Sequence, residues 1–169
     1  STSTAGGSIY CSYLKDAVNK VYQYDKTGKQ IREVQLPGLG TAYGFNAKKD
    51  EKETYYVFTS YVSPETIYKL DIASGKAELY KESKVQFKPE AFESKQVFYT
   101  SKDGTKIPMI ITYKKGIELN GKNPCLLYAY GGFNVSITPY FSTSNIILLE
   151  NGGIYAVPNI RGGGEYGEA

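Results

Sequence analysis

Histidine is absent from the 169 residues of this chain. Without an imidazole, the chain by itself cannot form a Ser-His-Asp triad or a Cys-His pair, and it lacks the commonest zinc ligand in proteins. Chemistry of those kinds therefore needs residues outside this sequence. We expect no metal or cofactor site within it.

Cysteine and long apolar segments are scarce. Each of the two cysteines, Cys11 and Cys125, lies inside a hydrophobic run, which favours two buried free thiols. No run of about 18 apolar residues could span a membrane, and residues 1–7 lack the basic end and apolar stretch of a secretion signal. We expect no membrane partner and a cytoplasmic location. A periplasmic or secreted protein stays the alternative, because a signal on a longer parent would be invisible here.

An excess of one charge is also missing. The chain has 20 Lys+Arg and 17 Asp+Glu, a net charge of +3, and its lysines are spread along the sequence. Because phosphate binding needs a concentrated basic face, we expect no nucleic-acid partner. The hydrophobic fraction of 41% with 22% charged residues is typical of a folded globular chain.

Short aromatic and β-branched runs fill the first half of the sequence, and they repeat. Residues 21–29 resemble residues 67–76: each is a predicted strand that ends in Asp and is followed by a glycine turn. Further strands are predicted before these segments (9–14, 54–61) and after them (31–36, 77–80). Several strands in about 40 to 50 residues are the length of one β-propeller blade. We predict blades over residues 1–87; two unrelated hairpins in a sandwich are the alternative.

A different hairpin follows. Residues 97–101 and 106–113 are predicted strands on either side of Asp103-Gly104, a pair suited to a tight turn. Pro108 has no N–H to give to a ladder, which predicts an edge strand or a bulge at that position.

From about residue 88 the pattern favours an α/β layer. The apolar run 125–130 is typical of a strand covered on both faces. Thr143-Ser144 could cap a short helix over 145–151 that ends at Gly152, and 154–157 is a second strand stopped by Pro158. Strand, helix and strand predict an α/β layer over residues 88–169, which is too short to be a finished domain.

Glycines follow both apolar strands. Gly131-Gly132 come after Tyr130, where backbone donors or a side chain could approach a ligand at the carboxyl end of a strand. A tight turn beside two core tyrosines is the alternative. Arg161 and the glycines 162–164 could form an anion-binding nest, but they lack the ending of a phosphate loop. We favour a structural loop in which Arg161 pairs with a carboxylate such as Glu165.

Three segments resemble the prolyl oligopeptidase family. They are residues 128–139 (YAYGGFNVSITP), residues 152–167 (GGIYAVPNIRGGGEYG) and residues 101–109 (SKDGTKIPM). The last matches the place where the family's chain passes from its propeller to its catalytic domain. Ala129 and Pro158 depart from the glycine and alanine that are usual in the family; both lie beside the functional positions.

The resemblance implies a serine peptidase with a β-propeller and an α/β-hydrolase domain, which cleaves short peptides after proline. Residues 1–87 would be its last blades and residues 88–169 the truncated start of the hydrolase domain. By match to the motif, Tyr130 would be the oxyanion-hole tyrosine, and Phe133 would line the S1 pocket that binds proline. The implied partners are short proline-containing peptides and the remainder of the polypeptide.

The nucleophile implied by the resemblance is not in this sequence. The family's serine lies in a Gly-x-Ser-x-Gly turn followed by its Asp and His, and this chain has neither that turn nor a histidine. We therefore expect the chain alone to be inactive. One alternative is a propeller-type binding or scaffold module with a non-catalytic hydrolase remnant. An esterase or acyl-peptide hydrolase of the same architecture is another.

Overall fold

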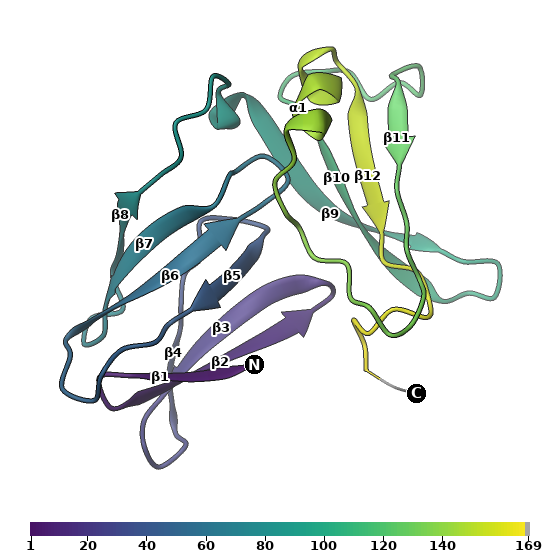
Figure 1. The fold of residues 1–169 in the computed structure, drawn as a ribbon. Coiled ribbons are helices and arrows are strands. Elements are labelled where there is room, and N and C mark those ends of the chain that lie inside the picture. Colours follow the sequence, from purple (N-terminus) through teal and green to yellow (C-terminus); the bar gives the residue numbers. More distant parts are fainter. Residues whose placement is uncertain (168–169) are drawn as a thin grey trace.

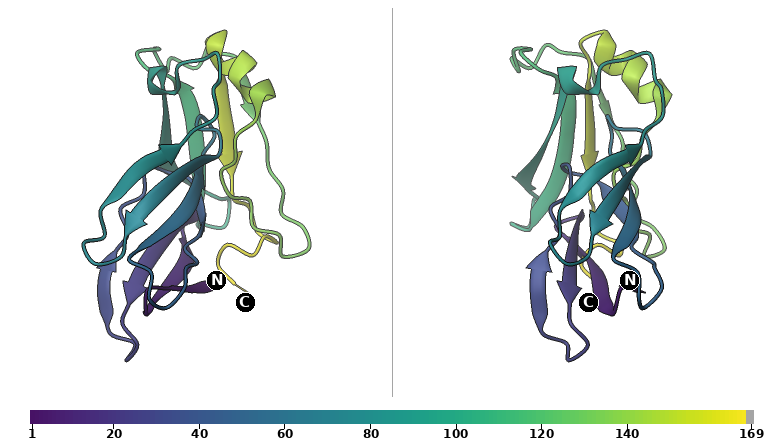
Figure 2. Two further views of the ribbon diagram at one scale, coloured as in Figure 1. Left: turned by 60° about the vertical axis from the view of Figure 1, so that its left-hand side comes forward. Right: turned by 90° about the vertical axis from the view of Figure 1, so that its left-hand side faces the viewer.

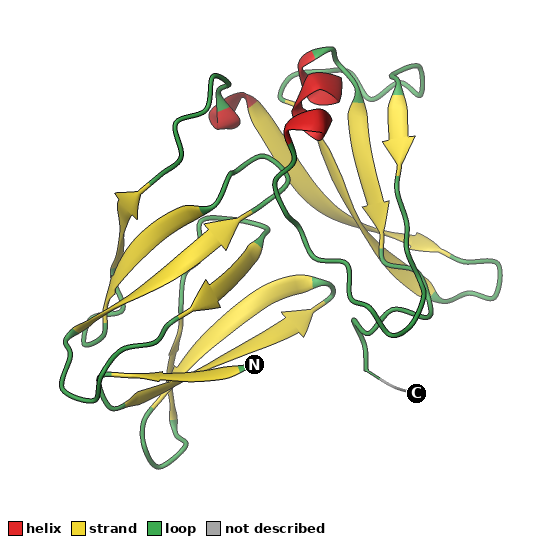
Figure 3. Cartoon of the chain, in the orientation of Figure 1, coloured by secondary structure: helices red, strands yellow, loops and turns green. Residues whose placement is uncertain are grey.

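A computed structural model describes residues 1–167 and folds them into three four-stranded sheets (Figure 1). Glu168 and Ala169, the end of the predicted second domain, lie outside the described residues. Strands dominate, and the helical parts are one short α-helix and one 3-10 turn within the described range (Figure 3). None of the helices described is long and apolar enough to cross a membrane.

The first two sheets are antiparallel meanders of strands in sequence order, as the repeat predicts. The first sheet consists of β1 (Thr2–Ala5), β2 (Ser8–Lys15), β3 (Val18–Tyr24) and β4 (Gln30–Glu33). The second sheet consists of β5 (Thr41–Gly44), β6 (Glu53–Thr59), β7 (Thr66–Asp71) and β8 (Ala77–Lys81). The sequence did not reveal β1 and β5, because each is only four residues long and neither segment (TSTA, TAYG) contains an apolar run.

Equivalent turns close the β3–β4 and β7–β8 hairpins. The Asp25 carboxylate accepts a hydrogen bond from the Thr27 N–H at 2.8 Å, and the Asp71 carboxylate accepts one from the Ser74 N–H at 2.7 Å. Hydrogen bonds from the Thr27 and Ser74 hydroxyls, followed by these backbone bonds, lower the pKa of both carboxyls. A glycine with positive φ follows in each turn, so the predicted Asp–Gly turns are confirmed.

A stack of aromatic rings joins the two meanders. The ring centroids of Tyr10 and Phe45 are 5.4 Å apart, and those of Phe45 and Tyr56 are 4.7 Å apart. All three side chains are buried, and burial raises the pKa of Tyr10 and of Tyr56 to about 12. The rings therefore form the shared core of the first two sheets.

The third sheet is mixed, with the order β11-β12-β10-β9. After the 3-10 turn η1 (Pro89–Ala91), β9 (Phe92–Thr100) and β10 (Lys106–Lys114) form the predicted hairpin. Strand β11 (Cys125–Leu127) then leads through α1 (Thr143–Glu150) to β12 (Ile154–Pro158), which lies parallel to β11. The predicted strand-helix-strand order is therefore present.

The expected burial of residues 125–130 is wrong for this chain. Strand β11 is only three residues long and pairs with β12 alone at the edge of the described sheet. Leu126 is 49% exposed and Leu127 is 63% exposed. The expectation of two buried thiols also fails, because Cys125 is exposed and Cys11 is only partly buried.

Pro108 lies on neither an edge strand nor a bulge. It pairs with Phe98 of β9 inside β10, which has neighbours on both sides. Its carbonyl accepts a hydrogen bond from the N–H of Asn159, the first residue after β12, at 3.0 Å. Since the N–H and C=O of a strand residue point to the same side, the missing donor faces the point where β12 has ended. An interior strand therefore tolerates this proline.

Helix α1 begins earlier than predicted. Its N-cap is Ser142, which makes no side-chain capping bond, and Thr143 is its first residue. Its predicted end is confirmed: Gly152 has a φ of 77°, and its N–H donates to the Leu149 carbonyl at 3.1 Å.

The third sheet and α1 pack against one end of the second sheet (Figure 2). The ring of Tyr61, just after β6, meets the ring of Tyr155 in β12 edge to face, with centroids 5.3 Å apart. The rings of Phe87 and Phe141 are stacked at 5.4 Å. These contacts create a second core, which places the loops after β11 and β12 beside the first two sheets.

Candidate functional site

Tyr130 and Phe133 lie on the loop that follows β11. The side chains are partly and almost fully exposed: Tyr130 is 38% accessible and Phe133 is 93% accessible. Phe133 and Asn134 have φ angles of 55° and 57°, a left-handed backbone that few residues other than glycine adopt. The loop thus presents a phenol and a phenyl ring near each other in sequence at the carboxyl end of a strand.

Close contacts surround the two glycines between them. A Cβ built on Gly132 would lie 3.2 Å from the Tyr130 hydroxyl oxygen, so the phenol lies against this glycine. A Cβ on Gly131 would lie 2.7 Å from the Ile160 side chain. Larger residues here would displace either the phenol or the neighbouring loop.

That neighbouring loop, residues 159–165 after β12, interlocks with the Tyr130 loop, which we define as residues 130–137. The Asn134 N–H donates to the Gly162 carbonyl at 3.0 Å. Gly162 has a φ of 92°, and a Cβ on it would overlap the Gly131 carbonyl. The two backbones therefore touch directly, and Figure 1 shows both loops at the same end of the third sheet.

Glu165 and Asn159 hold the far end of the Tyr130 loop. Glu165 is 7% exposed, and its Oε1 accepts hydrogen bonds from the Ile137 N–H at 2.8 Å and from Asn159 Nδ2 at 2.9 Å. The same Asn159 nitrogen donates to the Ile137 carbonyl at 2.8 Å. Both backbone polar groups of Ile137 are thus engaged by buried side chains.

Arg161 does not pair with Glu165, as the sequence led us to expect. Its guanidinium pairs with the Asp103 carboxylate and donates to the Ser101 hydroxyl at 3.2 Å and to the Thr105 hydroxyl at 3.4 Å. The prediction failed because Glu165 is nearer in sequence but turned inward, whereas the β9–β10 hairpin tip lies beside Arg161. The hydrogen bond from Arg161 lowers the pKa of Asp103 well below its usual range.

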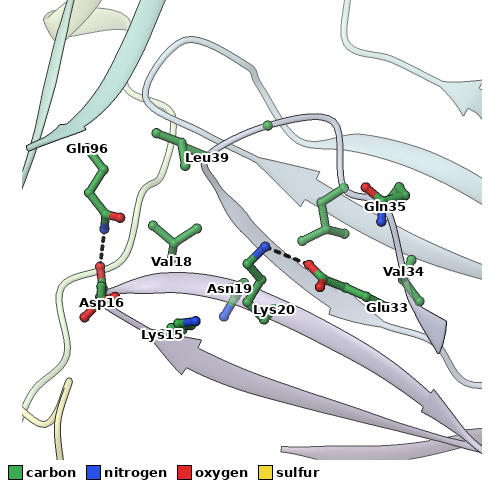
Figure 4. A pocket seen from close by; sticks show the side chains of 12 residues that line it. Lys15, Asp16, Val18, Asn19, Lys20, Glu33, Val34, Gln35, Leu39 and Gln96 are labelled. Carbon is green, nitrogen blue, oxygen red and sulfur yellow. Dashed lines mark hydrogen bonds and ion pairs between the residues drawn. The ribbon is translucent and has the colours of Figure 1, made fainter. Parts of the chain in front are cut away.

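Two hollows lie near these elements. One, of about 820 Å³, is bordered by the 159–165 loop and by Ile107 and Tyr166. The other, of about 470 Å³, lies where the first sheet meets β9 (Figure 4). In the second, Lys20 is paired with Glu33 at 2.7 Å, and Gln96 donates to the Asp16 carbonyl. Lys20 and Glu33 thus neutralise each other in the wall of this hollow. No sequence pattern had indicated the hollow.

This site can donate a hydrogen bond and offer an apolar surface to a ligand. It has no nucleophile and base of its own. The Tyr130 phenol can donate one hydrogen bond, and Phe133 offers a flat apolar surface. Within the described residues, no group of three or more His, Cys, Asp or Glu side chains could hold a metal ion.

The chain matches known proteins along nearly its whole length. The family model described as "Prolyl oligopeptidase, N-terminal beta-propeller domain" matches residues 1–83. The prolyl endopeptidase of Elizabethkingia miricola is 61% identical over 165 residues, which are 98% of this chain and 23% of that protein. The prolyl endopeptidase of Dictyostelium discoideum is 42% identical over 165 residues, which are 95% of this chain and 22% of that protein. This chain thus spans about a quarter of the length of these relatives.

Solved structures agree. One from a structural and mechanistic analysis of two prolyl endopeptidases has a TM-score of 0.87 and 46% identity, over 99% of this chain and 25% of that one. Prolyl oligopeptidase B from Galerina marginata, without ligand, has a TM-score of 0.87 and 33% identity, over 99% of this chain and 24% of that one. The chain is therefore a partial member of the prolyl oligopeptidase family, and its first two sheets are blades of that family's β-propeller.

Proposed function

We propose that this segment belongs to a serine peptidase that hydrolyses short peptides on the carboxyl side of proline through an acyl-enzyme. The observation that carries the proposal is the Tyr130 loop, where a partly exposed phenol and an exposed phenyl ring follow a strand end. Relatives named as prolyl endopeptidases match 98% of the chain at up to 61% identity, which supports the same conclusion.

We also propose a division into residues 1–87, the last propeller blades, and residues 88–169, the start of an α/β-hydrolase domain. Two observations support the boundary. The family's propeller model stops at residue 83. The topology then changes from antiparallel meanders to a parallel strand pair joined through a helix. Such a crossover is the building unit of α/β domains.

In this proposal Tyr130 stabilises the charge that develops on the substrate during acyl transfer. The scissile carbonyl oxygen becomes negative in the tetrahedral intermediate, and the phenol donates a hydrogen bond to it. A preformed donor of this kind contributes about 3 to 4 kcal/mol to lowering the barrier. The contact with Gly132 limits where the phenol can lie, which favours such preorganisation.

Phe133 forms part of the S1 pocket. Proline has a compact apolar ring and no backbone N–H, so a flat aromatic surface selects it by shape and burial. The left-handed backbone of Phe133 costs about 1 to 3 kcal/mol, and strain of this kind is concentrated at functional sites. The remaining walls, the nucleophilic Ser, the Asp and the His come from the rest of the polypeptide. The segment alone is inactive.

The test is hydrolysis of matched reporter peptides by the complete protein. We expect cleavage of a glycyl-prolyl reporter and at least tenfold slower cleavage of its glycyl-alanyl counterpart. The segment of residues 1–169 should cleave neither. No hydrolysis by the complete protein contradicts the peptidase and favours the scaffold alternative, whereas faster hydrolysis of an aryl ester favours the esterase.

A further inference from the structure

The conformation of the Tyr130 loop depends on residues that lie outside it. The loop has no strand or helix of its own. Its ends are held instead by the 159–165 loop. Gly131 contacts Gly162 at one end, and Glu165 and Asn159 hydrogen-bond to the Ile137 backbone at the other. The position of the Tyr130 phenol is therefore fixed only as well as the backbone of this loop is fixed.

Glu165 is the inner anchor of this support. Burying a carboxylate is costly unless hydrogen bonds compensate it, and Glu165 is buried with bonds to Ile137 and Asn159. Its Oε2 also lies against Gly163, where no side chain would fit. The carboxylate thus ties the Tyr130 loop to the 159–165 loop.

Arg161 is the outer anchor. Its guanidinium reaches three oxygens on the tip of the β9–β10 hairpin, whose strands pair over nine residues each. A planar guanidinium with several donors fixes orientation better than a single ammonium. Arg161 therefore connects the 159–165 loop to an element that is already ordered.

From these contacts we propose that Arg161 and Glu165 are positioning residues, which hold the Tyr130 loop so that its phenol can meet the oxyanion. The inference rests on the proposed function and deepens it. The two side chains act through the loop backbone: Arg161 binds the hairpin and Glu165 binds Ile137. Displacing a catalytic group by about 1 Å can cost as much as a hundredfold in rate, so the loss should fall on kcat.

The first experiment changes the outer anchor in the complete protein. Arg161→Met should lower kcat about tenfold with KM within about twofold, because orientation and not substrate binding is lost. Because its side chain is 62% exposed, the substitution should change the stability of the fold little. Arg161→Lys should recover part of the loss. Lys102→Met, which removes a cation from the same hairpin tip, is the matched control and should leave kcat unchanged.

The decisive experiment is a double-mutant cycle with Tyr130→Phe. If Arg161 acts by placing the phenol, Arg161→Met should slow the Tyr130→Phe variant less than twofold, although it slows the parent about tenfold. Equal losses in both backgrounds overturn the inference while leaving the proposed function intact. A normal rate for Tyr130→Phe alone removes Tyr130 from its role in the proposed function, and the inference falls with it.

The inner anchor gives an independent check. Glu165→Gln keeps an acceptor oxygen for Ile137, whereas Glu165→Ala removes it, so the kcat of Glu165→Ala should fall further. If Glu165→Ala does not fold, the Arg161 cycle alone decides. An unchanged kcat in a folded Glu165→Ala variant contradicts the role of Glu165.

Discussion

Asp103 and Arg161 form an ion pair between residues 58 positions apart, and both side chains are exposed to solvent. Exposed ion pairs usually add little to stability. This one is reinforced by the Ser101 and Thr105 hydroxyls on the same guanidinium, and so it defines a geometry more than it supplies free energy. The ion pair holds the 159–165 loop at Arg161 against the tip of the β9–β10 hairpin.

The lowered pKa of Asp103 predicts a dependence on acid. A carboxyl with a lowered folded-state pKa contributes stability above its ordinary value of about 3.9, and loses it as the pH falls through the lowered value. Asp103→Asn should therefore reduce the Tm slightly at pH 7, and the difference from the parent should start to shrink near pH 4 and vanish only below the lowered pKa of Asp103. Melting curves from neutral to acidic pH at low salt measure it. A difference independent of pH would refute the ion pair.

At the scale of elements, the two glycine-rich loops are shaped by contact with one another. Gly162 has both a left-handed backbone and no room for a Cβ, because the Gly131 carbonyl lies against it. Gly28, in the β3–β4 turn, has a similar φ of 86° but open space around it. Comparing substitutions at Gly28 and Gly162 therefore separates the cost of a positive φ from the cost of a steric clash.

Alanine substitutions should show this separation. Gly28→Ala should cost about 1 kcal/mol of unfolding free energy, from positive φ alone. Gly162→Ala should cost at least about 2 kcal/mol and also lower kcat, because the added methyl pushes the Tyr130 loop away. Urea unfolding midpoints and kcat of the complete protein measure both effects. Equal costs with unchanged kcat would mean that the loops are not coupled.

Local patterns predicted most of the elements, and long-range contacts account for the errors. The Asp–Gly turns, the hairpin at Asp103-Gly104 and the crossover through α1 are properties of short segments, so the sequence was sufficient. The partner of Arg161 and the tolerance of Pro108 depend on which strands lie alongside. Tyr130 and Phe133 were found by motif, but the left-handed backbone of Phe133 and the grip of Glu165 on Ile137 follow from packing between distant loops.

At the scale of the whole molecule, one core joins the second sheet to the third. Tyr61 is 2% exposed, meets the ring of Tyr155, and has its pKa raised by burial. Hydrogen bonds strengthen the same boundary: Thr41 Oγ1 donates to the Pro139 carbonyl at 2.6 Å. The segment that follows the Tyr130 loop is therefore anchored to a propeller blade at Pro139.

Tyrosine substitutions test this core. Tyr61→Ala should cost about 3 to 5 kcal/mol, as for other large buried aromatics. Tyr80→Ala is the control, because Tyr80 is 61% exposed, and it should cost less than about 1 kcal/mol. The midpoints of urea unfolding measure both. Similar midpoints for the two variants would contradict a structural core at this boundary.

The most direct test of the account is the rate of Tyr130→Phe in the complete protein, with Tyr128→Phe, at the first residue after β11, as control. Loss of the phenol hydroxyl should lower kcat for a glycyl-prolyl reporter about a hundredfold, equivalent to about 3 kcal/mol, while KM and Tm stay unchanged. The control should keep its rate. A Tyr130→Phe variant that turns over as fast as the parent would contradict the central claim that this phenol stabilises the oxyanion.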